Sequence, residues 1–233
     1  MHIPDGFING GTSAAAGVVA VAGLSVCVTK AAKTMDDKQV PMAGLASAFI
    51  FAVQMLNFPV ANGTSGHLLG GVLAAVLVGP WAGALCVSVV LVIQGLLFAD
   101  GGLSALGLNV INMALVGAWG GYALFILIRT FLPRTRSAVI GTAGVAAGLA
   151  PVLASIAFTL EYELGGNGAA SVGTVATAMV GVHVLIGIGE GIITGLAVAA
   201  VMTVRPDLVY GARDVVARAR PAPVPAVVGA AGS

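Results

Sequence analysis

Charged residues are scarce in this sequence. Only 8% of its 233 residues are Asp, Glu, Lys or Arg, whereas a soluble domain carries about 25%. The 10 basic and 9 acidic side chains nearly balance, so neither a nucleic-acid-binding surface nor an acidic solvating tail is indicated. These numbers exclude an ordinary soluble globular protein.

Cysteine is rarer still. Cys27 and Cys86 lie inside apolar runs, far from any CxxC or Cys/His spacing, and we interpret both as small buried hydrophobic residues. We therefore expect neither a disulfide framework nor a thiolate metal site. The sequence also lacks a Walker motif of the GxxxxGK[ST] kind, so this chain is not expected to hydrolyse ATP.

Apolar residues dominate instead, with 58% hydrophobic residues and 34 glycines. Continuous runs of Ala, Val, Leu, Ile and Gly are long enough to cross about 30 Å of hydrocarbon. A transmembrane β-barrel is excluded because it requires strict polar and apolar alternation. We predict an all-α membrane bundle of about seven helices, near residues 12–30, 40–60, 67–79, 81–99, 106–129, 138–161 and 178–203.

The third of these helices is the least certain to span. It is separated from the fourth by Gly79-Pro80-Trp81, which cannot continue a helix smoothly and predicts a tight turn. The predicted third helix, 67–79, has fewer residues than an ordinary transmembrane span needs. We therefore expect a short helix, a tilted one or a re-entrant one.

The positive residues predict the topology. They fall between the first and second helices, between the fifth and sixth, and after the seventh. The opposite connections contain none, so the positive-inside rule predicts an outside N-terminus and a cytoplasmic C-terminus. This holds only if the third and fourth helices form a hairpin. The cations are Lys30, Lys33, Lys38, Arg129, Arg134, Arg136, Arg205, Arg213, Arg218 and Arg220.

The last thirty residues differ in character from the rest. Residues 1–203 are predicted to form a single transmembrane domain, whereas 204–233 are first Arg-rich and then Pro- and Ala-rich. We expect 204–233 to be a disordered cytoplasmic tail. The basic stretch near 210–220 is compatible with contact to anionic lipid and equally with an ordinary topology anchor.

Polar residues inside the predicted helices gather in the outer half of the membrane. Because polar groups are costly in hydrocarbon, we interpret them as a pocket that opens outward and captures an extracellular solute. Two alternatives remain: Gln54, Gln94 and Asn112 as hydrogen-bonding contacts between helices, and pairing of His183 and Glu190 with each other or with backbone groups. The whole set is Gln54, Asn57, Gln94, Asn109, Asn112, His183 and Glu190.

The N-terminus suggests a metal chelate. Met1-His2 precedes the first helix without a basic region or a small-residue cleavage site, so a secretory signal peptide is not expected. If Met1 is retained, its α-amine, the His2 amide nitrogen and the His2 imidazole can close fused five- and six-membered rings on one ion. His67 is the obvious fourth donor, because it lies in a Gly-rich turn expected on the same side. Four nitrogens in a square suit Ni(II) or Cu(II), with Co(II) accessible.

The segments Met1-His2-Ile3-Pro4-Asp5-Gly6-Phe7, Asn62-Gly63-Thr64-Ser65-Gly66-His67-Leu68-Leu69-Gly70-Gly71 and His183-Val184-Leu185-Ile186-Gly187-Ile188-Gly189-Glu190-Gly191 resemble the CbiM/NikM family. Its members are substrate-capture components of energy-coupling factor cobalt and nickel importers. The resemblance runs from residue 1 to about 203. It implies seven helices and metal ligation by the Met1 amine, the His2 amide and imidazole, and His67.

The resemblance also implies partners in the prokaryotic cell membrane. These are a transmembrane coupling subunit, two cytoplasmic ATP-binding subunits and a small accessory membrane protein, which we expect to be a separate polypeptide here. A face of small residues on the first helix, Ser13, Ala16, Gly17 and Ala20, could contact the coupling subunit, although packing within the chain is the favoured role. Candidates for orienting the ligating imidazoles are Asp5, Asn62, Ser65 and His183.

Two other functions match some of these residues. Gly63-Thr64-Ser65-Gly66 matches the GxSG motif of rhomboid-type intramembrane proteases, with Ser65 as nucleophile and His183 as base. The second helix, however, offers no His for the oxyanion. An ion or proton channel would use Glu190 and His183 as a relay, but no ionisable residue lies between Glu190 and Arg205 on the path inward.

Overall fold

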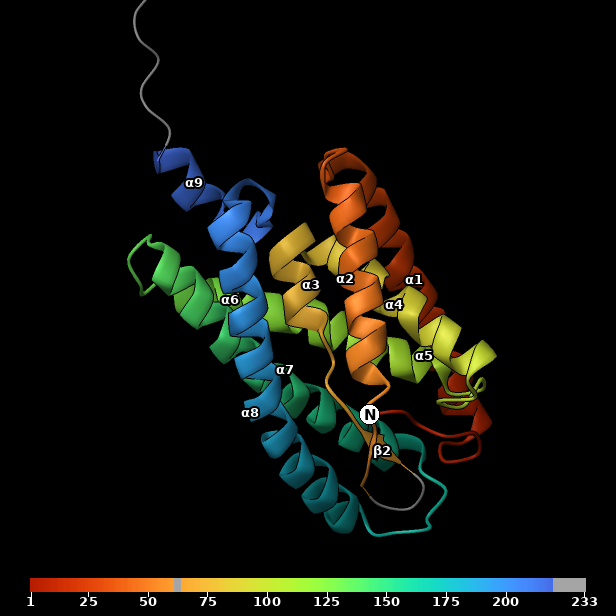
Figure 1. Cartoon of the computed structure of the whole chain (residues 1–233). Helices are drawn as coiled ribbons and strands as arrows, with labels where there is room; N and C mark the ends of the chain where they lie inside the picture. The colour runs from red at the N-terminus through yellow and green to blue at the C-terminus, as the bar shows by residue number, and fades with distance from the viewer. Residues whose placement is uncertain (61–63, 220–233) are drawn as a thin grey trace, which may run out of the picture.

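The protein is a bundle of helices around a short, buried central helix (Figure 1). The computed structural model describes residues 1–60 and 64–219. Its elements are α1 (Gly10–Thr34), α2 (Gln39–Gln54), β1 (Phe58–Pro59), β2 (Ser65–Gly66), α3 (Gly71–Val78), α4 (Pro80–Leu97), α5 (Leu106–Asn109), the π-helix η1 (Val110–Gly120), α6 (Gly121–Arg129), α7 (Arg136–Gly165), α8 (Val172–Val204), the 3₁₀ turns η2 (Pro206–Leu208) and η3 (Tyr210–Ala212), and α9 (Arg213–Ala219).

The predicted helical membrane bundle is confirmed. Within the described residues, five helices are long and apolar enough to cross a membrane: α1, α4, the continuous α5–η1–α6, α7 and α8. Large apolar side chains such as Val18, Leu97 and Leu185 are exposed on their outer faces. Small residues face inward, where they permit close helix packing. The protein is therefore a multi-pass membrane protein.

The second and third predicted helices were too long. Residues 55–60 do not extend α2, because Pro59 disfavours a helical conformation at Phe58, and Phe58–Pro59 pairs with Ser65–Gly66 as a two-stranded antiparallel sheet. Residues 67–70 precede α3 rather than open it. All eight residues of α3 are buried, and a helix of that length rises only about 12 Å, so α3 does not cross the membrane by itself.

The tight turn predicted between α3 and α4 is present. Gly79 ends one helix and begins the next at φ +94°, a left-handed conformation that favours glycine. Pro80 follows at the first position of α4, where its missing N–H costs no hydrogen bond. α3 and α4 therefore form a hairpin.

The helices α7 and α8 run side by side along one face of the bundle (Figure 1). Their backbones approach so closely that a Cβ atom on Gly191 would lie 2.7 Å from Gly144 O, and one on Gly187 would collide with Gly148 O. This contact fixes α8, which carries His183 and Glu190, against the rest of the bundle.

The small residues of α1, Ser13, Ala16, Gly17 and Ala20, pack mostly within the chain. Ser13, Ala16 and Ala20 are buried. Gly17 lies against Gly107 of α5, because a Cβ atom on Gly107 would lie 2.6 Å from the Gly17 backbone. Packing within the chain, the favoured role, is what the structure contains.

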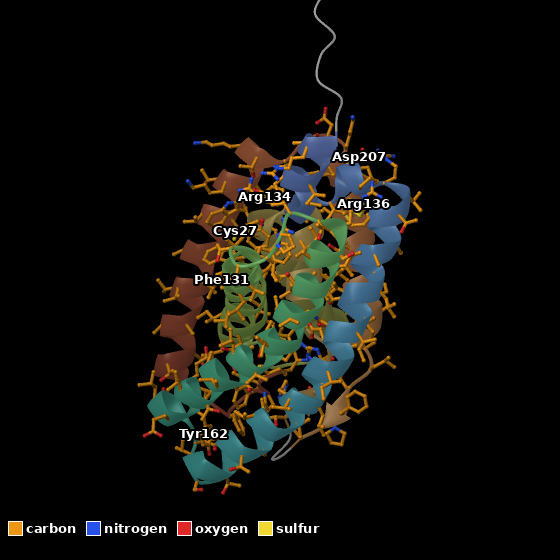
Figure 2. The ribbon with its side chains drawn as sticks, turned by 90° about the vertical axis from the view of Figure 1, so that its left-hand side faces the viewer. Cys27, Phe131, Arg134, Arg136, Tyr162 and Asp207 are labelled. Atoms are coloured by element: carbon orange, nitrogen blue, oxygen red, sulfur yellow. The ribbon has the colours of Figure 1, made fainter. Side chains whose placement is uncertain are left out.

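The expectation of a disordered tail from residue 204 is wrong as far as Ala219. Residues 206–219 form η2, η3 and α9, with Val209 and Ala212 buried and the Tyr210 ring against Tyr122. This segment lies at the same end of the bundle as Arg134 and Arg136 and opposite Tyr162 (Figure 2). Residues 220–233 lie outside the described part of the chain.

Candidate metal centre

The N-terminal residues enter the bundle instead of lying on its surface. Met1 and Ile3 are fully buried, and the chain start lies beside β2 and below α3 (Figure 1). Ile3 N–H donates to Asn109 Oδ1 (2.8 Å), while Gly102 N–H donates to Ile3 O (2.8 Å). Because buried backbone groups need partners, these bonds fix the path of the first three residues.

Two glycines make room for this path. A Cβ on Gly102 would collide with the backbone N of Asp5, and Gly101 adopts φ +93°, where a Cβ would lie 3.0 Å from His2 Cδ2. The loop between α4 and α5 can therefore approach the N-terminal segment only because it lacks side chains here.

Further contacts hold the segment before α1. The Phe7 ring lies 5.0 Å from that of Tyr162, and Asn9 N–H donates to Gly165 O (2.7 Å). Asp5, expected to orient an imidazole, instead accepts hydrogen bonds from Ser104 N–H (2.8 Å) and Ser104 Oγ–H. Asp5 therefore ties the N-terminal segment to the α4–α5 loop.

The His2 imidazole is buried at the base of this segment. Its Nδ1 lies 3.0 Å from Asp100 Oδ1, and within the described residues its Nε2 has no hydrogen-bond partner. Burial lowers the pKa of His2, although the neighbouring Asp100 opposes that shift. The sequence did not single out Asp100, whose one signal was an acid beside two glycines in an expected outer loop.

His67 lies against His2. The two ring centroids are 4.6 Å apart and the ring planes are inclined by 33°. His67 Nδ1 is 2.8 Å from Leu68 O, a carbonyl that can only accept, so we assign the proton to Nδ1. Its Nε2 then presents a lone pair and has no partner in the part of the chain described. Burial and the charges of the N-terminus and His2 lower the pKa of His67 well below its usual value.

The turn after His67 is held by two helices. Glu190 on α8 accepts Leu69 N–H (2.6 Å) and Gly70 N–H (2.9 Å), and Gln54 on α2 donates to Leu69 O (2.7 Å). Of the two expected partners for Glu190, His183 or backbone groups, the structure contains backbone groups. Hydrogen bonds to a carboxylate are stronger than neutral ones, so α8 fixes the position of His67.

The Met1 α-amine completes the cluster. Burial lowers the pKa of this amine well below its usual value, against the opposing effects of Asp100 and Glu190. Amine and imidazole nitrogens bind metal only when deprotonated. The lowered pKa values of Met1, His2 and His67 therefore favour the forms that can act as metal ligands.

A cavity of about 300 Å³ leads to His2 from the side of the α4–α5 loop. Asp5, Ser65 and Asp100 line it together with Gly101 and Gly102. Asp100 also accepts a hydrogen bond from Asn57 Nδ2 (2.8 Å). Two carboxylates at this cavity would raise the local concentration of cations.

The remaining predicted residues lie at different distances from the cluster. His183 is buried, with Nδ1 2.7 Å from Met179 O, and it contributes to lowering the pKa of His67. Gln94 faces His2 and raises the pKa of His2 against the effect of burial, whereas Asn112 Nδ2 donates to Glu161 (2.6 Å), a pair the sequence did not indicate. Asn62 lies outside the described residues.

The side-chain arrangement does not resemble a protease site. His183 Nδ1 is engaged by Met179 O, and Ser65 Oγ has no hydrogen-bond partner among residues 1–60 and 64–219. The same residues contain no group of three or more His, Cys, Asp or Glu side chains suited to a metal ion. Side chains of these four types alone therefore do not form a metal site in the described part of the chain.

The chain is similar to known cobalt and nickel transport proteins. Residues 2–208 match the model of CbiM, the cobalt uptake substrate-specific transmembrane region. The cobalt transport protein CbiM of Sorangium cellulosum is 39% identical over 174 residues, covering 72% of this chain and 75% of that protein. The fused nickel transport protein NikMN of Rhodobacter capsulatus is 38% identical over 171 residues, covering 69% of this chain and 48% of that protein.

Solved structures of transition metal transporters also resemble this chain. A crystal structure of a truncated transition metal transporter superimposes with a TM-score of 0.80 at 33% identity, covering 87% of this chain and 99% of that one. A second transition metal transporter structure gives a TM-score of 0.81 at 32% identity, covering 88% and 93%.

Proposed function

Because the chain belongs to the CbiM family of cobalt uptake transmembrane regions, we propose that it captures Co(II) or Ni(II) from outside the cell for an energy-coupling factor importer. Membership makes the chain a cobalt or nickel transport component, which is not an enzymatic role. We further propose a mechanism of capture, a source of energy and a direction of transport.

The observation that carries the mechanism is the juxtaposition of three metal-binding groups at one buried point. The Met1 amine is enclosed, the His2 and His67 rings lie 4.6 Å apart, and His67 Nε2 lacks a partner within the described residues. The amine, the deprotonated His2 amide and the His2 imidazole would chelate the ion, and His67 Nε2 would supply the fourth nitrogen. Such a set suits Ni(II) and Co(II).

Chelation by His2 requires a rearrangement. A six-membered ring that includes the His2 amide nitrogen must use Nδ1, and this atom lies 3.0 Å from Asp100 Oδ1. We infer that the incoming ion draws Nδ1 away from Asp100. Asp100 would then hold His2 before capture and attract the cation to the cavity that leads to it.

Charge balance favours the same site. A divalent ion on one deprotonated amide leaves a net charge of about +1, and an unpaired buried charge is strongly disfavoured. The carboxylates of Asp100 and Glu190 lie near enough to raise the pKa of the Met1 amine against burial. They are therefore placed to offset the charge of the bound ion.

Release needs partners. The sequence has no Walker motif, so ATP would be hydrolysed by two cytoplasmic subunits acting through a transmembrane coupling subunit, with a small accessory membrane protein. The fused relative in Rhodobacter capsulatus, less than half of which this chain covers, supports an association with further transporter parts. In this arrangement the N-terminus faces outside and the C-terminus faces the cytoplasm.

Elemental analysis of the purified chain with a native N-terminus tests capture. About one cobalt or nickel ion per chain is expected, and a metal content unchanged by His67→Ala would contradict the proposal. Uptake into vesicles tests the importer. Transport should require ATP and all partner subunits, and uptake by this chain alone would refute that part.

A further inference from the structure

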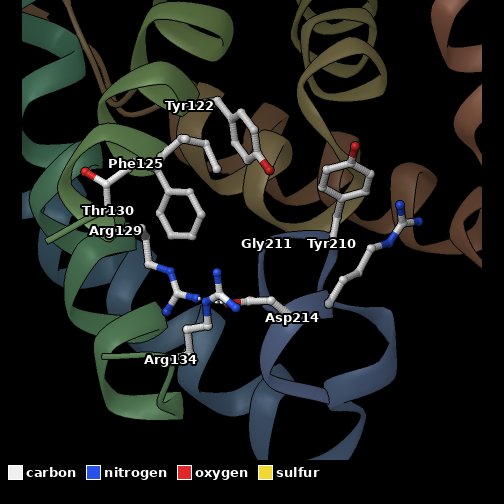
Figure 3. A pocket seen from close by; sticks show the side chains of 10 residues that line it. Tyr122, Phe125, Arg129, Thr130, Arg134, Tyr210, Gly211 and Asp214 are labelled. Carbon is white, nitrogen blue, oxygen red and sulfur yellow. Dashed lines mark hydrogen bonds and ion pairs between the residues drawn. The ribbon is translucent and has the colours of Figure 1, made fainter. Parts of the chain in front are cut away.

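A second site lies at the opposite end of the molecule from the metal centre. The end of α6 meets η3 and α9 around a cavity of about 370 Å³ (Figure 3). We call it the basic pocket, and its polar lining includes Tyr122, Arg129, Arg134, Tyr210, Arg213 and Asp214. Neither the capture of metal nor its charge balance uses any of these residues.

Arg129 is the buried base of the basic pocket. Its side chain is only 9% exposed, and its Nη2 lies 2.7 Å from Asp214 Oδ2. Its Nη1 is buried, and no acceptor within the described residues reaches it. Buried donors are almost always paired in proteins, so Nη1 indicates a missing acceptor.

The charges of the basic pocket do not cancel. Among the described residues, three arginines and one aspartate line it, and Arg134 Nε is 3.7 Å from the same Asp214 Oδ2 that pairs with Arg129. Figure 3 shows the guanidinium groups of Arg129 and Arg134 converging beside Asp214. Two converging guanidinium groups match the oxygens of a phosphate.

Arg213 lines the side of the basic pocket, away from the place where the guanidinium groups of Arg129 and Arg134 converge. Its guanidinium carbon lies 4.0 Å above the Tyr210 ring, and its Nη2 is 3.3 Å from Gln39 Oε1. The missing acceptor would therefore bind Arg129 and Arg134, which share Asp214 as their one carboxylate among the described residues of the pocket.

The surroundings of the basic pocket are those of a membrane boundary. Ile126 lines the pocket and is 46% exposed, and Phe131 in the following loop is 81% exposed. Exposed apolar side chains beside arginines and tyrosines are typical of the level where headgroups meet acyl chains. A free anion would contact the arginines but would leave these apolar side chains uncovered.

We propose that the basic pocket binds a phosphate group, supplied by an anionic phospholipid of the adjoining leaflet. The phosphate accepts hydrogen bonds from Arg129 Nη1 and Arg134, and the acyl chains cover Ile126 and Phe131. This end carries the cations predicted to face the cytoplasm, where membranes are rich in anionic lipid.

The test compares lipid retention by the full-length chain in detergent, measured by native mass spectrometry with phosphatidylglycerol and phosphatidylcholine in competition. Arg134→Gln leaves the Arg129–Asp214 pair in place. It should reduce the preference for phosphatidylglycerol about fivefold, as expected for one surface cation. The matched control is Arg136→Gln, an exposed arginine in the same stretch that does not line the basic pocket, and it should retain the preference.

A second measurement separates the two sources of phosphate. Phosphatidylglycerol should raise the melting temperature of the unaltered chain, and inorganic phosphate at matched ionic strength should not. Equal lipid preference in Arg134→Gln and the unaltered chain, or an equal loss in Arg136→Gln, would overturn the site. Stabilisation by inorganic phosphate without any effect of phosphatidylglycerol would overturn the lipid assignment.

Discussion

Glu190 accepts the backbone N–H of Leu69 at 2.6 Å, joining the middle of α8 to the turn that follows His67. The same carboxylate accepts Gly70 N–H at 2.9 Å. Any displacement of α8 relative to the bundle would therefore move His67 with respect to Met1 and His2. Under the proposed function, this connection would give ATP-hydrolysing partner subunits a route by which movement of α8 opens the metal centre.

Glu190→Gln should weaken metal binding at least about tenfold, because one amide oxygen cannot replace two carboxylate oxygens and a hydrogen bond to a charged group contributes about 1.5–3 kcal/mol. Isothermal titration calorimetry with Co(II) or Ni(II) would measure the change. Thr194→Val, a buried position four residues further along α8, should alter affinity much less. An unchanged affinity in Glu190→Gln would show that the turn does not need the carboxylate.

His67→Ala should reduce metal affinity by more than about a hundredfold, because loss of a ligand should cost more than the 10–100-fold typical of outer-shell partners. His183→Asn is the comparison, since His183 contacts Met179 O and is not expected to ligate. This variant should reduce metal affinity less than about tenfold, which is below the range typical of outer-shell partners. Equal losses in the two variants would remove the distinction between ligand and neighbour.

Gly102→Ala should impair metal binding without touching a ligand. The new Cβ would collide with the Asp5 backbone and displace the N-terminal segment from Asn109. Gly10→Ala is a matched control, because a Cβ there has open space. Metal titration of both variants, with melting temperatures recorded without metal, tests this. Wild-type affinity in Gly102→Ala would mean that the close approach does not position Met1 and His2.

The sequence predicted the positions of the long helices well because apolar runs of membrane length are a strong local signal. It also predicted that Met1, His2 and His67 would meet, since all three were expected on one side of the membrane. The predicted lengths of α2 and α3 were wrong because an apolar run does not show where the helix ends. Phe58–Pro59 form a strand, and Gly70 adopts a left-handed conformation before α3.

Other features depend on contacts between distant residues. Glu190 reaches a turn 121 residues earlier in the chain, and no spacing rule links them. The segment after residue 204 was predicted to be a disordered tail because its composition is basic and Pro-rich. Its order comes from burial of Val209 and Ala212 and from the Arg129–Asp214 ion pair, which only the folded bundle brings together.

A single residue added before Met1 tests whether the α-amine of Met1 ligates the ion. The purified chain with a native N-terminus should bind about one Ni(II) or Co(II) ion, whereas a chain with a single glycine before Met1 should bind none tightly. The extension converts the amine into an amide, and a melting temperature measured without metal would check that the extended chain still folds. Stoichiometric, equally tight binding by the extended chain would contradict the account.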